Sequence, residues 1–442
     1  MLIDAHCHFF TKNVLTQSLS KLENHMERLE RMSKPAAKVG SAELVQLGTN
    51  TFEFVNKAIQ LTPLEMYEEM KKSYGEPFIA VPLMLDLSYA FIAPQDKMIE
   101  NKKSLIRSMK NIAEKKRNEG VSDWMNNLSL SIEKKLDVYD RSVMLMDVFK
   151  NSYEEQINDL TTVKKQYPEY IFPFFSIDPR RDDEFEEGVL GEIKKYIGKD
   201  KPFIGLKLYT SLGYSPTHPV LYDNAGKESV YEYCEKHQIP ITVHASLEGF
   251  SHMLDKNYVE GDVYYASAGR AVPSEDVYEE GIVTYKNNIG RLDFAELTAE
   301  RLLILNHPFI WKKVLKKYPK LKINMAHFGG SIQISKFLNN NQTGFYSEYI
   351  IDLMSEFPNV YTDLSCLYNY ENKPDYMVEV YEKLYKPLPE HIKSRVLYGS
   401  DYFMISLFNT DLKDYIELFR EAFGEEFTRI SESNPTKFIF DS

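Results

Sequence analysis

The sequence is poor in cysteine, with three among its 442 residues. Cys7, Cys234 and Cys366 cannot all pair with one another, and none of them belongs to a Cys-x-x-Cys motif. The sequence therefore argues against a disulfide framework and against a zinc knuckle. This cysteine content predicts that the protein works in a reducing compartment.

Long apolar runs are also missing. The longest, residues 78–85, contains Pro82 and falls far below the roughly 18 residues that a membrane helix needs. The opening MLIDAHCHFF has an acid at position 4 and no cationic segment before a long apolar one, so no signal peptide is expected. Together these absences predict a cytoplasmic protein that binds no membrane.

Positive charge is in deficit, because 53 lysines and arginines face 65 aspartates and glutamates and leave a net charge of −12. Such a chain repels phosphate backbones, so nucleic acid is not an expected partner. The nucleophile elbow GxSxG, the phosphate-binding P-loop and the dinucleotide motif GxGxxG are absent from the sequence. Serine hydrolases, nucleotide hydrolases and dinucleotide enzymes therefore find no support.

Hydrophobic residues, in contrast, make up 43% of the chain, which is enough for a large packed core. They gather in eight short runs that alternate with helical stretches, as expected of strands buried on both faces. This alternation favours an α/β fold of the (β/α)8 TIM barrel type over a doubly wound sheet. The runs are Leu2–His6, Phe78–Asp86, Ile171–Asp178, Phe203–Tyr209, Ile239–His244, Leu321–His327, Asn359–Asp363 and Arg395–Asp401.

The surplus length is expected to form insertions in a single barrel domain that spans residues 1–442. They follow strands 1, 2 and 5 and cover about 9–77, 88–136 and 248–298. The second is helical in pattern and rich in lysine and arginine, which indicates a solvated helix face. An anion-binding patch or a subunit contact in a homo-oligomer is the alternative. The third has no strong periodicity, and we interpret it as a lid.

Four of the ten histidines fall at the C-terminal ends of predicted strands. His6 and His8 end the first run, His244 the fifth and His327 the sixth, and Asp401 ends the eighth in the same way. Catalytic groups of a barrel converge at this rim, so these five side chains are expected to meet. His6 and His8 are two positions apart on a strand and therefore point to the same side.

Neutral imidazoles together with a carboxylate suit Zn²⁺ and similar divalent metals, and three or four such ligands leave a position for water. The pattern therefore predicts a catalytic metal site. The alternative is that His244 and His327 only fill polar positions at the rim, and that Asp401 caps the helix that follows it. That alternative requires a coincidence at four separate strand ends.

The same segments resemble the amidohydrolase superfamily, specifically the amidohydrolase-related branch (amidohydrolase 2) of metal-dependent barrel hydrolases. The resemblance runs nearly end to end and follows the order of that family's strand-end motifs. The matching motifs are DAHCH at 4–8, GLKLYTSLGYSP at 205–216, ITVHAS at 241–246, INMAHFGG at 323–330 and LYGSDYF at 397–403. They are specific for the branch but not for any one substrate.

The resemblance implies that His6, His8, His244 and Asp401 bind one metal, with His327 beside it as a second-site ligand or a proton-handling residue. Asp401 would accept a proton from metal-activated water, and His327 would hydrogen-bond the developing oxyanion or the leaving group. The implied activity is hydrolysis of an amide, a lactone or another C–N or C–O bond of a small molecule. The implied metal is Zn²⁺.

Lys207 ends the fourth run, where two-metal members of the superfamily carry a carboxylated lysine that bridges their ions. A carbamate there would hold a second metal together with His244 and His327. An unmodified lysine is cationic and a poor ligand, and it would instead pair with a substrate carboxylate or an acidic neighbour. The one-metal branch commonly has a plain lysine in this context, which favours the unmodified form.

Two other functions stay open on the sequence. Some relatives in the branch are non-oxidative decarboxylases of aromatic or enoic acids, which use the same metal with a proton donor. A substrate of either kind of enzyme can carry a carboxylate, for which Lys207, Tyr209, Arg270 and Arg291 are candidate partners. A catalytically silent metal-binding barrel is the third hypothesis, and the presence of all five strand-end groups argues against it.

Several acids near strand ends need a separate interpretation. Asp86 either reaches the pocket or caps the next element, with no preference between the two. Glu248 is expected to be a loop acid, with contact to the substrate or to a ligand histidine as the alternative. Asp4 is expected to orient the first strand rather than bind metal. Sugar hydrolysis would require two strand-end carboxylates and gives the histidines no role.

Overall fold

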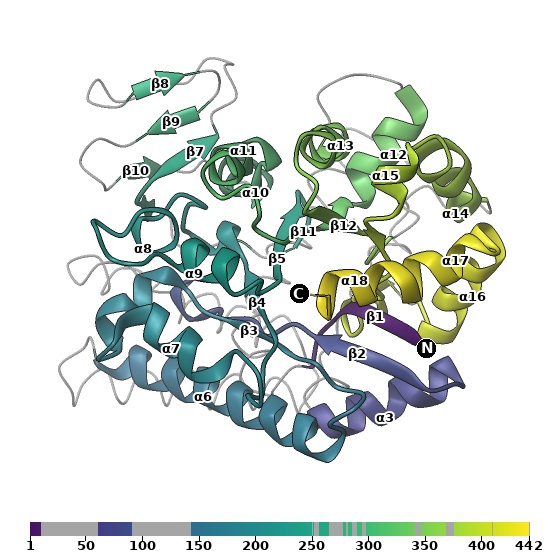
Figure 1. Cartoon of the computed structure of the whole chain (residues 1–442), viewed down its shortest axis with the longest axis horizontal. Helices are drawn as coiled ribbons and strands as arrows, with labels where there is room; N and C mark the ends of the chain where they lie inside the picture. Colours follow the sequence, from purple (N-terminus) through teal and green to yellow (C-terminus); the bar gives the residue numbers. More distant parts are fainter. Residues whose placement is uncertain are drawn as a thin grey trace, which may run out of the picture.

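The computed structural model describes residues 1–9, 61–90, 143–249, 251, 256–264, 277–279, 282–284, 290–293, 298–340, 346–367, 375–408 and 410–441. Parallel strands lie at its centre (Figure 1). Six of them form a sheet in the order β13–β12–β11–β5–β4–β3, and β1 pairs with β2. Their bounds are β1 Leu2–Cys7, β2 Phe78–Pro82, β3 Phe174–Ser176, β4 Gly205–Leu208, β5 Ile241–Ser246, β11 Ile323–Gly329, β12 Val360–Asp363 and β13 Val396–Leu397.

Backbone hydrogen bonds join these two sheets at both edges. β2 meets the segment that leads into β3, where Ala80 N donates to Tyr170 O at 2.8 Å and a parallel bridge follows. β1 meets the segment that follows β13, where Asp401 N donates to His6 O at 2.7 Å. The eight parallel strands therefore close into a ring, which confirms the predicted (β/α)8 architecture.

Each predicted run overlaps one strand, and the ends differ by a few residues. The largest differences are at the ends of β2 and β13, which both stop four residues before their runs end. In β13 two residues, Val396–Leu397, pair as a strand although the run continues to Asp401. The chain beyond Leu397 still adjoins β1, because Ala5 N donates to Tyr398 O at 3.1 Å. The strands are almost wholly buried, as expected of nearly continuous apolar runs in a parallel sheet.

Helices surround the strands on the outside (Figure 1). Among the described helices, none has the length and apolar character needed to cross a bilayer. The α-helices are α3 Pro63–Tyr74, α6 Val143–Gln166, α7 Gly188–Tyr196, α8 Pro219–Tyr222, α9 Val230–Lys236, α10 Thr298–Asn306, α11 Pro308–Lys317, α12 Ser331–Asn340, α13 Tyr346–Glu356, α14 Tyr376–Glu379, α15 Glu390–Lys393, α16 Leu412–Phe423, α17 Glu426–Thr428 and α18 Asn434–Ile439.

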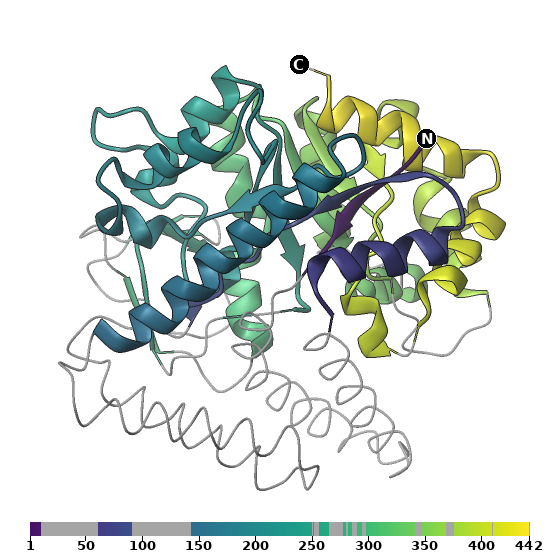
Figure 2. The same cartoon turned by 90° about the horizontal axis from the view of Figure 1, so that it is seen from below.

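Helix α3 shows how local sequence signals fix the outer layer beside the first two strands. Thr62 forms a capping box with Glu65, Pro63 occupies the first turn, and Gly75 ends the helix in the left-handed region with φ of 66°. Its buried face packs on the core, and α3 and α6 lie next to each other outside β2 (Figure 2). This packing brings the buried Tyr74 toward β1.

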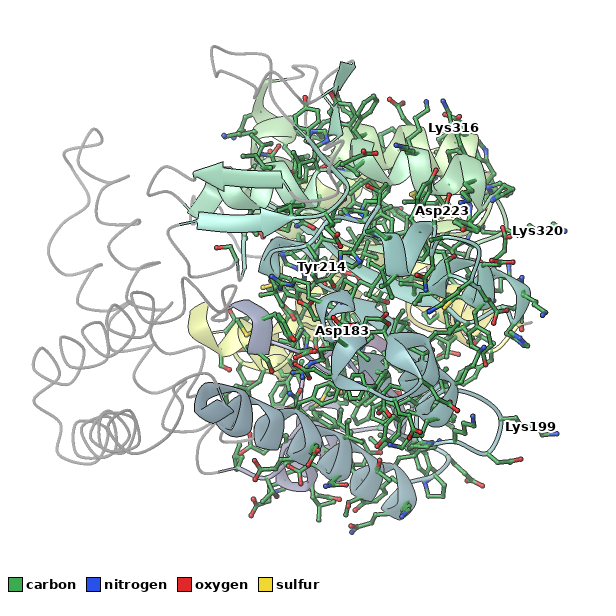
Figure 3. The ribbon with its side chains drawn as sticks, turned by 90° about the vertical axis from the view of Figure 1, so that its left-hand side faces the viewer. Asp183, Lys199, Tyr214, Asp223, Lys316 and Lys320 are labelled. Atoms are coloured by element: carbon green, nitrogen blue, oxygen red, sulfur yellow. The ribbon has the colours of Figure 1, made fainter. Side chains whose placement is uncertain are left out.

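The two ends of the barrel differ in what they carry. Lys199 precedes β4 and Lys320 precedes β11, and these two exposed side chains project outward at the right-hand edge of the molecule in Figure 3. Lys316, which also precedes β11, lies near the top of the same view. Asp183 and Tyr214 follow β3 and β4, and they lie toward the opposite side in the same view. The C-terminal ends of the strands, where the candidate site residues lie, therefore face away from this lysine-bearing edge.

The predicted insertions are described only in part. The described end of insertion 9–77 is largely α3, and insertion 88–136 lies outside the described residues apart from a short 3₁₀ helix at Ser88–Ala90. Within 248–298 the sequence predicts no strands, but short antiparallel ones are present. They are β6 Lys256–Val259, β7 Asp262–Tyr264, β8 Val277–Glu279, β9 Ile282–Thr284 and β10 Gly290–Asp293.

One part of the third insertion is fixed to the barrel. Asp262 N donates to Thr217 Oγ1 at 2.6 Å, and Lys313 Nζ lies 2.7 Å from Asp262 Oδ2. The interpretation of this insertion as a lid stays a prediction. Two candidate carboxylate partners cannot be placed from it, because Arg270 lies outside the described residues and so does the side chain of Arg291.

Candidate metal centre

The five strand-end residues meet at one end of the barrel, and each is at most 5% exposed. His6 Nε2 lies 3.5 Å and His8 Nε2 lies 3.2 Å from the same atom, Asp401 Oδ1. His244 Nδ1 lies 3.1 Å from His327 Nε2. The rings of His6 and His327 have centroids 4.7 Å apart, which connects the two groups.

Two of these residues have a strained backbone, with φ of 69° at His327 and 54° at Asp401. Non-glycine residues rarely adopt this left-handed region, and such strain concentrates at functional sites. Hydrogen bonds hold both turns, because Gly330 N donates to His327 O at 2.8 Å and Met404 N donates to Asp401 O at 2.6 Å. The strained backbone conformations therefore fall at His327 and Asp401, two of the residues that the sequence assigns to the site.

The two histidines of β1 turn their Nε2 atoms toward Asp401 because their Nδ1 atoms are held from behind. His8 Nδ1 lies 2.8 Å from Leu83 O, a carbonyl that can only accept a hydrogen bond. His6 Nδ1 lies 3.1 Å from Asp363 Oδ2. If both rings are neutral and donate through Nδ1, each has a lone pair on the Nε2 atom that faces Asp401.

The other two histidines are held in the same way. His244 Nε2 lies 2.6 Å from Glu248 O, and the His244 ring stacks on Tyr209 with centroids 4.1 Å apart. His327 Nδ1 lies 3.3 Å from Ser365 O. Donation to these two carbonyls leaves lone pairs on His244 Nδ1 and His327 Nε2, the two atoms that face each other.

The site therefore presents four imidazole lone pairs and a carboxylate oxygen to one another. His6 Nε2 and Asp401 Oδ1 are buried and have no hydrogen-bond partner in the described part of the chain. Buried acceptors that face one another repel unless a proton or a cation lies between them. The donor set, with nitrogen atoms in excess and one carboxylate, fits Zn²⁺ and similar borderline metals.

Burial sets the charges that such an ion needs. It lowers the pKa of His6 to about 3, and it also lowers the pKa of His244 and of His327. Burial acts in the opposite direction on Asp401, but the close contact with His8 and the other neighbouring histidines hold the pKa of Asp401 well below its usual range. Neutral imidazoles and an ionised carboxylate are the forms that bind a divalent cation.

A sequence model of one protein family, described as amidohydrolase, matches residues 141–440, which is more than half of the chain. The chain belongs to the amidohydrolase family. Members of this family are metal-dependent enzymes, so the chain is an enzyme of that kind. A comparison with curated proteins gave no significant match.

Solved structures resemble the chain over nearly its whole length but at low identity. A 5-carboxyvanillate decarboxylase from Novosphingobium aromaticivorans with bound manganese is 11% identical, with 99% of this chain and 97% of that chain covered and a TM-score of 0.48. A 4-oxalomesaconate hydratase from Rhodopseudomonas palustris is 13% identical, with 99% and 95% covered and a TM-score of 0.42. Similarity at this level does not extend to reaction or substrate.

Lys207 of this amidohydrolase-family chain lies in β4 with its side chain fully buried. Its Nζ has no hydrogen-bond partner among the described residues. Burial lowers the pKa of this ammonium group to about 8, and the nearby charges of Asp363 and Asp401 oppose the shift. Lys207 is therefore a further buried polar group without a hydrogen-bond partner in the described part of the chain, and its Nζ lies 5.5 Å from the centre of the Tyr209 ring.

The structure shows what three further acids near the strand ends contact, namely Asp86, Glu248 and Asp4. Asp86 is structural, because Arg181 Nε donates to it at 2.6 Å inside the protein. Glu248 accepts a hydrogen bond from Ser331 N at 2.8 Å, at the start of α12. Asp4 lies below His6 and accepts hydrogen bonds from His6 N, Ser400 and Tyr74, as expected of a residue that orients β1.

Sequence reasoning missed the residues that surround the histidines. Asp363 ends the seventh run in the same way as Asp401 ends the eighth, but it has no role in the site predicted from the sequence. That position could have identified it. Ser365 and Asn324 carry no comparable signal, because a serine in a turn and an asparagine in a strand occur in many structural contexts.

Proposed function

We propose that this amidohydrolase-family protein is a hydrolase that binds one divalent ion, Zn²⁺, through His6, His8, His244 and Asp401. The substrate is a small molecule with an amide, a lactone or another C–N or C–O bond. The observation that supports this proposal is the set of inward lone pairs, since each histidine has its other ring nitrogen within reach of an oxygen acceptor. A structural role at the rim would not require four rings with that arrangement.

When bound, such an ion supplies an acidified water and polarises the scissile carbonyl. Asp401 Oδ1 is the group placed to accept the proton of that water, because it is ionised and lies beside the ligand atoms of His6 and His8. His327 Nε2 carries a lone pair while its Nδ1 faces Ser365, so it can take up a proton and return it to the leaving group. The side chains of Asp401 and His327 are buried, so little bulk water reaches them.

The metal content of the purified protein is the first prediction. Protein prepared without added ions should contain about one equivalent of zinc or a similar divalent metal. Removal by a chelator should abolish turnover, and added Zn²⁺ should restore it. Protein that retains full turnover after the metal has been removed would contradict the proposed metal chemistry.

The same metal analysis, applied to a Lys207 variant, tests whether Lys207 is carboxylated. If Lys207 carries a carbamate, metal analysis should give two equivalents, and Lys207→Ala should reduce them to one. If Lys207 is unmodified, wild type and Lys207→Ala should both hold one equivalent. The unmodified form is the one we propose, with the Lys207 ammonium as partner of a substrate carboxylate.

Isotope labelling of the products is the second prediction and tests the reaction itself. A panel of small carboxamides, lactones and aromatic carboxylic acids is incubated with the enzyme in H₂¹⁸O. Hydrolysis should place one ¹⁸O atom in the product. Release of CO₂ without such incorporation would overturn hydrolysis in favour of decarboxylation. Turnover of no panel member by metal-loaded protein would contradict the proposed substrate class.

A further inference from the structure

Asp363 is the buried acid of the site to which the proposed function assigns no role. It ends β12, and it is fully buried. Its Oδ1 accepts hydrogen bonds from His327 N at 2.9 Å and from Ser365 N at 3.2 Å. Its Oδ2 accepts one from Asn324 Nδ2 at 2.7 Å and lies 3.1 Å from His6 Nδ1.

These contacts require a carboxylate that only accepts. A backbone N–H cannot accept a hydrogen bond, so Oδ1 must be an acceptor toward both His327 and Ser365. The same reasoning applies to Oδ2 and the amide nitrogen of Asn324. His6 Nδ1, which faces Oδ2, therefore has to carry the ring hydrogen, and the lone pair of the neutral ring lies on Nε2.

Ser365 extends this control to a second ring. Its hydroxyl has a single hydrogen, which it donates to Asp363 Oδ1. The Ser365 oxygen then acts as an acceptor toward both His6 Nδ1 at 3.1 Å and His327 Nδ1 at 2.9 Å. One carboxylate thus fixes the hydrogen of two imidazoles, one directly and one through a hydroxyl group.

We propose that Asp363, with Ser365 as its relay, is a positioning residue that sets the ring tautomers of His6 and His327 and so turns their Nε2 lone pairs into the site. The effect of these tautomers on metal binding rests on the proposed function. The tautomers themselves can be measured without a metal. A partner of this kind behind a ligand histidine typically changes metal affinity by about 10- to 100-fold.

Asp363→Asn reverses the tautomer while keeping the shape of the side chain. The new amide group cannot take the place of Oδ1, because two backbone N–H groups point there. It must take the place of Oδ2, because the side-chain amide of Asn324, unlike a backbone N–H, can turn over and present its unpartnered oxygen as an acceptor there. In that position the new amide group donates a hydrogen bond to His6 Nδ1. The ring hydrogen of His6 then moves to Nε2 and points at Asp401, so that His6 can no longer act as a ligand through that atom.

Asp363→Asn should therefore weaken Zn²⁺ binding by about 100-fold, measured by competition with a chromogenic chelator. Ring ¹⁵N chemical shifts of metal-free protein should show His6 protonated at Nδ1 in wild type and at Nε2 in the variant, with assignment by His6→Ala. Asn324→Ala is the matched control, since it removes the other hydrogen bond to Oδ2 but keeps the contact between Asp363 and His6. It should bind Zn²⁺ nearly as tightly as wild type.

Unchanged Zn²⁺ affinity in folded Asp363→Asn would overturn the inference. So would a wild-type spectrum in which His6 carries its hydrogen on Nε2, and this result is available even if the variant does not fold. A wild-type protein that binds no metal but has the expected tautomers would contradict the proposed function. The inference that Asp363 sets the tautomers would still hold. An equal loss of affinity in Asn324→Ala would count against a specific role for Asp363.

Discussion

Asp401→Asn is expected to lower kcat/KM by about 10³-fold or more and to leave the fold intact. The variant loses the negative charge and the proton acceptor at Oδ1, the atom that lies within 3.5 Å of both His6 Nε2 and His8 Nε2. The backbone should tolerate the change, because asparagine adopts the left-handed region more readily than most residues and φ at this position is 54°. Steady-state kinetics and thermal unfolding measure the two effects.

Asp411→Asn is a matched control for this experiment. Asp411 is exposed, and its side chain caps α16 by accepting a hydrogen bond from Lys413 N at 2.7 Å. Asparagine is an equally good cap, so the same chemical change should leave kcat/KM and unfolding unchanged. Turnover of wild-type magnitude in Asp401→Asn would remove its proposed role as the proton acceptor.

Arg181→Met is expected to lower the free energy of unfolding by about 3–5 kcal/mol. Arg181 is 2% exposed, and its guanidinium group donates to Asp86 Oδ2 at 2.6 Å, to Asp86 Oδ1 at 2.9 Å and to Glu184 Oε2 at 2.5 Å. The substitution leaves the Asp86 carboxylate buried without its cation, so most of the loss comes from the uncompensated charge. Urea denaturation of metal-loaded protein measures the change.

The double variant Asp86→Leu with Arg181→Met separates this charge effect from lost packing. Removal of both members of a buried ion pair is far less harmful than removal of one. The double variant should recover part of the lost stability, although Asp178 N then loses its acceptor, Asp86 Oδ2. A double variant that is less stable than Arg181→Met alone would show that packing, rather than the unpaired carboxylate, dominates.

The strands of the barrel could be predicted from the sequence because strands covered on both faces leave a nearly continuous apolar run. This rule identified all eight, including Val360–Asp363, which has only four residues. It fails for the strands within 248–298, such as Val277–Glu279, which are three or four residues long and pair antiparallel in a polar segment. Such strands form where local partners permit, and no period of apolar residues marks them.

The candidate site could be predicted in position but not in its hydrogen bonding. His6, His8, His327 and Asp401 follow from the rule that polar side chains at strand ends converge, and the structure brings them together. His244 contacts the others through His327, at 3.1 Å. Which nitrogen of each ring carries hydrogen depends on neighbours such as a carbonyl or a carboxylate from a distant segment, so it cannot be derived from the sequence.

The meeting of β1 with the segment after β13 has a consequence for the synthesis of the protein. His6 leaves the ribosome well before Asp401, whose backbone N–H donates to the His6 carbonyl. The other strands can form in order as the chain is synthesised, but β1 has no neighbour on one side until β13 and the segment after it have been made. If His6, His8 and Asp401 bind the metal as proposed, metal capture is among the last steps of maturation, and chains that end before β13 should contain no metal.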